Sequence, residues 1–149
     1  MKIGAPKELA KGEARVALTP DSAQLIHKLG HECLIESGAG TAAGFDDAAY
    51  RAAGVTVVES AAALWREAEV VIKVREPTDA EADLLRDGQT LIAFFWPAQN
   101  EALLERCRAK GATVVAMDMV PRISRAQKMD ALSSMGNIAG YRGVIEAGN

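Results

Sequence analysis

The sequence predicts an α/β domain of the Rossmann-like or flavodoxin-like kind, with three layers and a mostly parallel sheet, ending in a long helix. Short apolar runs alternate with helical segments that carry start and stop signals. Several of these runs lack polar alternation, as expected where helices cover both faces of a sheet. The length of 149 residues suits one domain that can bury a core of its own.

Six short apolar segments are the candidate strands. They are rich in β-branched residues and are separated by turn and cap residues. In chain order they are Lys2–Ala5, Glu32–Ile35, Thr56–Val58, Val70–Lys73, Thr90–Phe94 and Thr113–Ala116.

Helices between the strands are predicted from their boundary residues. A hydroxyl, carboxylate or amide side chain favours the N-cap, proline favours the first turn, and glycine favours the end. A threonine followed by a glutamate three positions later also forms a capping box. The expected helices run from Thr19 with Pro20 to Gly30, from Asp46 to Ala53, from Thr78 with Glu81 to Gly88, and from Asn100 to Gly111.

The last segment predicts one longer helix, from about Asp130 to Ala147, of about 25 Å at about 1.5 Å per residue. Small residues recur along it, but polar residues interrupt the run. We therefore interpret the small residues as sites of close packing against another protein element, and not as a membrane dimerisation stripe. The small residues are Gly136, Ala139, Gly140, Gly143 and Ala147.

Composition excludes several classes of protein. A net charge of −3 gives no reason to expect nucleic acid as a partner. No run of about 18 apolar residues is present, and the first residues do not resemble a signal peptide, so a soluble cytoplasmic domain is expected. Cys33 and Cys107 form no Cys/His cluster, and we predict buried apolar thiols and no metal site.

A glycine-rich segment, Gly38–Ala43, matches the looser GxGxxA form of the dinucleotide fingerprint. Glu59 follows about 20 residues later, as in such sites. However, Glu36 would lie near the phosphates, and Asp46 is a better N-cap for the helix that follows. We therefore interpret the segment as a connecting loop, with a nucleotide site as the alternative.

A polar loop precedes the long helix, in the segment Pro121–Asp130 (PRISRAQKMD). Loops that follow strands are where α/β proteins place binding groups, yet a capped surface loop would have a similar composition. Residue chemistry alone leaves both interpretations open.

The segment PRISRAQ-x-MDALSS-x-x-NIAGYR resembles the signature of the NAD-binding subunit of proton-translocating NAD(P) transhydrogenases, in the alanine dehydrogenase/transhydrogenase family. Other blocks agree, and together they extend the resemblance over the whole chain. These blocks are Lys2–Glu8, Arg15–Pro20, Glu36–Gly40, Phe45–Asp47 and Phe95–Asn100.

The resemblance implies a cofactor role for Arg122, Gln127, Asp130 and Ser133, which would orient the nicotinamide of NAD(H). Gln127 and Asp130 would be the catalytic pair, with Gln127 also facing the NADP(H) of a partner component. Direct hydride transfer from NADH to NADP+ is a positioning task and needs no base at the reacting carbons.

The resemblance also implies an organisation and a setting. Residues 1–128 would form the N-terminal α/β domain, and residues 129–149 a helix leading to an absent dinucleotide-binding Rossmann domain. The partners would be the NADP-binding and membrane components of the transhydrogenase, with a homodimer of this subunit. Its location would be cytoplasmic and peripheral to the inner membrane, without insertion of this segment.

Two alternatives are kept open. Alanine dehydrogenase shares the architecture, and Arg15 and Lys73 occupy positions that match its substrate residues; its catalytic histidine aligns with Trp96. Oxidative deamination needs a group that titrates near neutrality, so Trp96 favours transhydrogenase. His27 and His31 flank the end of the first helix, where a structural role is expected. The second alternative is a non-catalytic, truncated interaction module.

Overall fold

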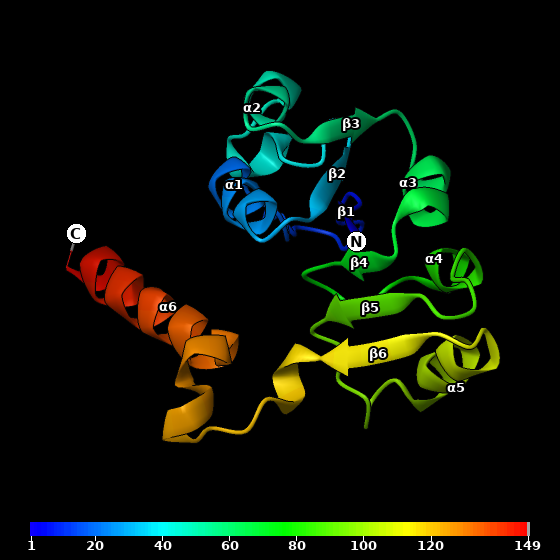
Figure 1. The fold of residues 1–149 in the computed structure, drawn as a ribbon. Coiled ribbons are helices and arrows are strands. Elements are labelled where there is room, and N and C mark those ends of the chain that lie inside the picture. Colours follow the sequence, from blue (N-terminus) through cyan, green and yellow to red (C-terminus); the bar gives the residue numbers. More distant parts are fainter. Residues whose placement is uncertain (149) are drawn as a thin grey trace.

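The computed structural model describes residues 1–148, which form a six-stranded parallel sheet between helical layers (Figure 1). The strand order is β3-β2-β1-β4-β5-β6, and every neighbouring pair is parallel. The predicted fold class is confirmed, and the sheet is wholly parallel. The strands are β1 (Lys2–Ala5), β2 (Glu32–Glu36), β3 (Thr56–Val58), β4 (Val70–Ile72), β5 (Thr90–Ala93) and β6 (Thr113–Ala116).

Nine helical elements connect or follow the strands within residues 1–148. Thr19 and Thr78 form capping boxes at the helices they begin, as predicted. The α-helices are α1 (Pro20–Lys28), α2 (Asp47–Ala52), α3 (Ala61–Glu67), α4 (Asp79–Asp83), α5 (Glu101–Ala109) and α6 (Ala131–Ala147). The 3-10 helices are η1 (Thr41–Ala43), η2 (Met117–Met119) and η3 (Ser124–Met129).

Three local predictions need correction. Helix α4 ends at Asp83, well before Gly88, where its end was expected. Helix α3 was not predicted; it begins at Ser60, whose hydroxyl accepts a hydrogen bond from the Ala63 amide. Asn100 occupies the N-cap position of α5, but its side chain does not cap the helix. The Asn100 amide nitrogen instead donates to the carbonyl oxygens of Phe95, at 2.8 Å, and Trp96, at 3.4 Å.

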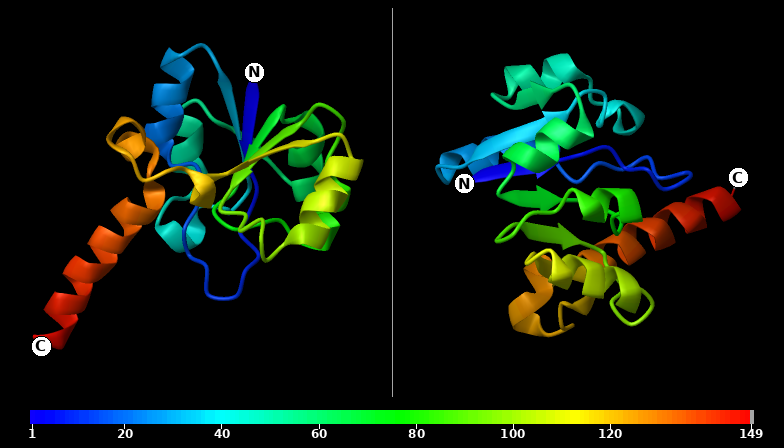
Figure 2. Two further views of the ribbon diagram at one scale, coloured as in Figure 1. Left: turned by 90° about the horizontal axis from the view of Figure 1, so that it is seen from below. Right: turned by 90° about the vertical axis from the view of Figure 1, so that its right-hand side faces the viewer.

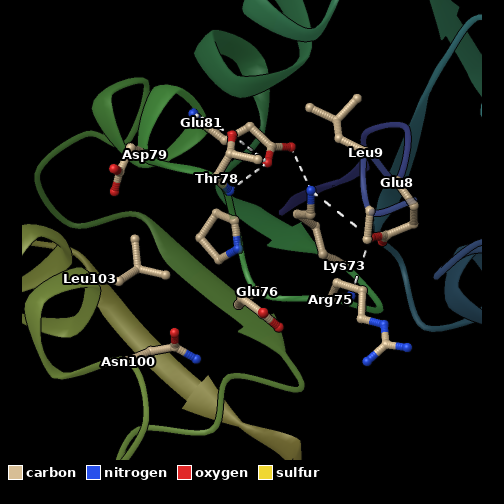
Figure 3. Close-up of a pocket in the computed structure, with 12 residues that line it drawn as sticks. Glu8, Leu9, Lys73, Arg75, Glu76, Thr78, Asp79, Glu81, Asn100 and Leu103 are labelled. Carbon is tan, nitrogen blue, oxygen red and sulfur yellow. Dashed lines mark hydrogen bonds and ion pairs between the residues drawn. The ribbon is translucent and has the colours of Figure 1, made fainter. Parts of the chain in front are cut away.

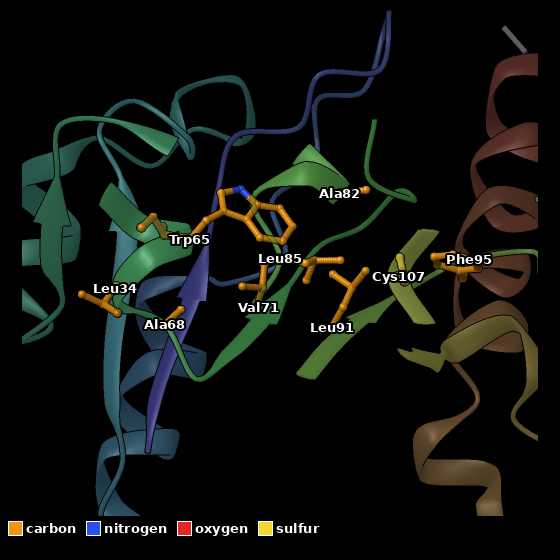
Figure 4. Packing of buried hydrophobic residues seen from close by; sticks show 10 residues of the cluster. Leu34, Trp65, Ala68, Val71, Ala82, Leu85, Leu91, Phe95 and Cys107 are labelled. Atoms are coloured by element: carbon orange, nitrogen blue, oxygen red, sulfur yellow. The ribbon is translucent and has the colours of Figure 1, made fainter. Parts of the chain in front are cut away.

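The core consists of two apolar layers, one on each face of the sheet. Helices α1 and α2 cover one face, and α3, α4 and α5 cover the other (Figures 1 and 2). On the second face, Trp65 and Leu91 are fully buried and pack in one cluster with Cys107 (Figure 4). Cys33 belongs to the opposite layer, and both cysteines are free, buried thiols whose pKa is raised by burial. This confirms their predicted packing role.

The Gly38–Ala43 segment is a connecting loop, as interpreted from the sequence. Helix α2 begins after Asp46, whose carboxylate accepts from the Ala49 amide, so the glycines do not open that helix. The Gly38 amide donates to the carboxylate of Asp47 at 2.8 Å, where a phosphate would be required in a nucleotide site. The Gly38 amide is therefore already paired within this chain.

Helix α6 projects away from the layers (Figure 2). It has no buried residue, and apolar side chains such as Ile138, Tyr141 and Val144 are strongly exposed. The expected long helix is thus confirmed, whereas the domain boundary after residue 128 stays a prediction. Within the described residues, none of the helices has the length and apolarity needed to cross a membrane.

Candidate functional site

The arrowheads of β5 and β6 point toward the side on which η3 and the start of α6 lie (Figure 1). Because every neighbouring pair of strands is parallel, the carboxyl ends of the strands lie along one edge of the twisted sheet. In open parallel sheets, ligands bind outside these ends, especially where the strand order reverses. That reversal lies here between β1 and β4. The hollows formed by residues that follow the strands at this edge include a loop hollow after β6 and a switch-point hollow after β1 and β4.

The loop hollow has a volume of about 330 Å³. All four cofactor residues expected from the sequence line it, so the structure brings them together around one space. Ile123 and Ser124 complete the wall and were not singled out, although both lie within the same polar segment. The lining residues are Arg122, Ile123, Ser124, Gln127, Asp130 and Ser133.

Asp130 organises the loop hollow. Its carboxylate is the N-cap of α6, accepting from the Ser133 amide at 2.9 Å and from the Ser133 hydroxyl at 2.5 Å. The hydrogen bond from the hydroxyl, with help from the Arg122 charge, lowers the pKa of Asp130. Asp130 is therefore ionised at neutral pH, and it fixes the position of Ser133.

The other groups of the loop hollow are accessible. Arg122 and Gln127 are exposed, whereas Ala126, on η3, is buried and anchors the segment between them. The hollow thus combines a cation, a carboxylate, an amide and a hydroxyl on a short, anchored loop. This set can donate and accept hydrogen bonds but holds no obvious proton-transfer group for neutral pH.

The switch-point hollow, of about 320 Å³, contains a buried charge cluster (Figure 3). Lys73 directly follows β4, and its ammonium lies 2.5 Å from a Glu81 oxygen and 4.0 Å from a Glu8 oxygen. The Glu8 carboxylate also accepts from the amides of Val74 and Arg75. Desolvation raises the pKa of Glu8. Lys73 is therefore enclosed by this chain's own carboxylates.

Arg15 lies in a second ionic group beside α6. Glu13 accepts from the guanidinium groups of both Arg15 and Arg75, and Arg15 also approaches the sulfur of Met135 at 2.7 Å. The hydrogen bond from Arg15 is the main cause that lowers the pKa of Glu13 to about 2. Arg15 thus connects the loop after β1 to the first turns of α6.

The lowered pKa of Glu13 leads to a pH prediction. Because the folded value lies below the ordinary 4.5, the contribution of Glu13 to stability is present above pH 4.5 and is lost as pH falls toward 2. Glu13→Gln should lower the free energy of unfolding by about 1–2 kcal/mol at pH 7, allowing for its half-exposed partners. Urea unfolding of both proteins from pH 7 to pH 2.5 measures this, and a pH-independent difference would contradict it.

Comparison with known proteins agrees with this architecture. Residues 4–139 match the family model described as alanine dehydrogenase/PNT, N-terminal domain. The chain belongs to this family. It is 73% identical, over all 149 residues, to the NAD(P) transhydrogenase subunit alpha of Cereibacter sphaeroides and spans 28% of that protein.

Two solved structures show the same fold. A transhydrogenase from Sinorhizobium meliloti matches with a TM-score of 0.93 and 38% identity, over 99% of this chain and 44% of that one. An L-alanine dehydrogenase matches with a TM-score of 0.77 and 41% identity, over 80% of this chain and 33% of that one. The chain therefore spans less than half the length of each of these relatives.

The placement of the histidines bears on the choice between the two enzymes of the family. Nδ1 of His27 lies 2.9 Å from the carbonyl oxygen of His31, between α1 and β2. This is the amino end of the sheet, opposite both hollows. Trp96 occupies the loop after β5. The chain has two histidines, and neither lies at the carboxyl edge.

Proposed function

We propose that this chain is the N-terminal domain of the NAD(H)-binding subunit of a proton-translocating NAD(P) transhydrogenase. Its loop hollow would position the nicotinamide for direct hydride transfer from NADH to NADP+. The observation that carries the proposal is the convergence of Arg122, Gln127, Asp130 and Ser133 on one hollow. The 73% identity to a transhydrogenase subunit alpha supports it.

The groups of the loop hollow suit the carboxamide of a nicotinamide. A carboxamide both donates and accepts, and Gln127 can do the same. Asp130, being ionised, can accept only, whereas Arg122 can donate only. Bound nicotinamide would supply the hydride, and the residues of this chain would fix the orientation of the ring.

Positioning is the chemical contribution expected of this loop. Hydride exchange between two nicotinamides moves no proton at the reacting carbons, so holding the rings at near-attack distance is the main requirement. Gln127 is exposed on η3 and can also reach toward a second nucleotide. Asp130 acts by fixing Ser133 and the start of α6.

The proposal extends to the setting of the domain. NAD(H) would be held mainly by a Rossmann domain connected through α6, and NADP(H) by a partner component, with further components in the membrane. The subunit would be a homodimer located on the cytoplasmic face of the inner membrane. The exposed apolar residues of α6 are consistent with further protein contacts.

Alanine dehydrogenase activity is less well supported. Lys73 is paired with Glu8 and Glu81, and Trp96 stands where that reaction needs a titrating base. Both histidines of the chain lie at or just after the end of α1, so no imidazole is available at the carboxyl edge.

The proposal is tested by two conservative substitutions in the full-length subunit. Gln127→Asn or Asp130→Asn should slow hydride transfer by about 10-fold or more, because small displacements of the reacting rings have large effects on rate. NADH affinity should change little, since the cofactor would be held mainly elsewhere. Single-turnover hydride transfer and calorimetric titration with NADH measure the two effects separately.

Lys128→Gln is the matched control, because Lys128 lies on η3 but does not line the hollow. Its hydride-transfer rate should match that of the unmodified protein. Unchanged rates in both Gln127→Asn and Asp130→Asn would contradict the proposed role of the loop.

A further inference from the structure

Trp96 has an unusual backbone conformation. Its φ angle is 51°, and it is the one residue other than glycine with a positive φ in the described part of the chain. For a bulky L side chain this left-handed region is a genuine outlier, because Cβ crowds the following carbonyl. Such conformations persist only where surrounding contacts impose them, and they cluster at functional sites.

Asp118 and Asn100 impose this conformation. The carboxylate of Asp118, on η2, accepts from the Phe95 amide at 2.6 Å and from the Trp96 amide at 3.1 Å. Asn100 donates its side-chain amide to the carbonyl oxygens of Phe95 and Trp96. Phe95 itself is fully buried. The turn is therefore held from both sides, and relaxation of Trp96 would break these bonds.

The indole is not part of the core. Trp96 is 38% exposed, whereas Trp65, the other tryptophan, is fully buried. Trp96, Pro97 and Met119 help to line an open hollow of about 190 Å³ at the carboxyl edge of β5 and β6. Core packing therefore does not explain why the fold places a tryptophan in a strained turn.

Residues that line the Trp96 hollow lie a few positions before residues that line the loop hollow. Asp118 and Met119 line the former, and the chain runs from them through Val120 and Pro121 to Arg122, which lines the latter. Element η2 also contacts both β5 and α6. A ligand that enters the loop hollow would thus lie on the same edge of the sheet as the indole.

We infer that Trp96 is a contact residue for a flat ring of the dinucleotide, presented by the Asp118 clamp. This inference rests on the proposed function and adds a residue to it. A small open hollow walled by an indole, a proline and a thioether suits one planar heteroaromatic ring, and ring stacking on an indole tolerates different bases. Asp118 is then a positioning residue, because it acts through Trp96.

The test substitutes Trp96 in the full-length subunit. Glycine adopts a positive φ without strain, so Trp96→Gly keeps the turn and removes the ring, and it should weaken NADH binding by about 10-fold. Trp96→Phe keeps a flat ring, and its Kd should stay within about 3-fold of the unmodified protein. Weaker binding by Trp96→Gly together with near-normal binding by Trp96→Phe would assign the contact to the flat ring.

Calorimetric titration with NADH measures the Kd of each variant, and thermal unfolding shows that each variant is folded. An unchanged Kd in Trp96→Gly would overturn the inference, whether or not the variant also assembles less well with the NADP-binding component. If Gln127→Asn slows hydride transfer while Trp96→Gly binds normally, this inference fails and the proposed function stands. If Trp96→Gly binds normally and neither Gln127→Asn nor Asp130→Asn slows hydride transfer, both fail.

Discussion

Lys73→Met is expected to lower the free energy of unfolding by about 3–5 kcal/mol. Methionine is close to lysine in length and is apolar, so the substitution creates little cavity; it removes the charge. Glu8 and Glu81 would then face each other in a buried site without a cation. Removing one partner from a buried ionic cluster has this large effect because the remaining charges cannot be solvated.

Urea unfolding of the two proteins at pH 7 measures the effect. Arg106→Met is the matched control, because Arg106 pairs with Asp79 and Asp83 at both ends of α4 but is 40% exposed. Exposed pairs contribute little, so the control should lose less than about 1 kcal/mol. If Lys73→Met lowered the free energy of unfolding no more than Arg106→Met does, water would have to reach the carboxylates of Glu8 and Glu81.

The charge cluster marks a limit of prediction from the sequence. The resemblance matched Lys73 to a substrate residue of alanine dehydrogenase, but the partners of Lys73 in this chain could not be assigned. Glu8 lies 65 positions away in the sequence, and the two meet because β1 and β4 are neighbours in the sheet. Local patterns predict strands, whereas strand order depends on tertiary packing. The same reason explains why Arg75, which joins Arg15 on Glu13, was missed.

Elements with strong local signals were predicted well. All six strands are confirmed to within one residue at each end, because each is a short apolar run between polar boundaries. Helix α3 was missed because Ala61–Glu67 has only two large apolar residues, Leu64 and Trp65, which are adjacent and show no helical period. The Ser60 cap and the alanine-rich composition favour this helix locally, and it packs against β1 and β2.

The loop hollow was accessible to prediction because its residues are close in sequence. Arg122 to Ser133 spans one connection and the first turn of α6, so the family resemblance could indicate the whole set. The strained turn at Trp96 had no sequence signal, since tryptophan does not favour a positive φ. Its conformation depends on Asp118, 22 positions later, and only the folded chain shows that contact.

Gly40→Ala is expected to lower the free energy of unfolding by about 3 kcal/mol, at the upper end of the effects of overpacking. A Cβ at Gly40 would lie 2.6 Å from the Tyr50 ring and hydroxyl and 2.8 Å from the carbonyl oxygen of Phe45. Tyr50 cannot move aside easily, because it is fully buried and its hydroxyl donates to the Leu18 carbonyl at 2.7 Å. The side chain, the loop backbone or both must shift.

Gly44→Ala separates crowding from backbone strain. Gly40 has an ordinary φ of −87°, so its substitution adds crowding alone. Gly44 has a φ of 86°, and a methyl group there would meet nothing within 4 Å, so its substitution adds strain alone, of about 1–2 kcal/mol. Denaturant unfolding of both variants compares the two. If Gly40→Ala lowered the free energy of unfolding less than Gly44→Ala does, close packing against Tyr50 would not explain the glycine at position 40. The nucleotide interpretation of the GxGxxA pattern would then be favoured again.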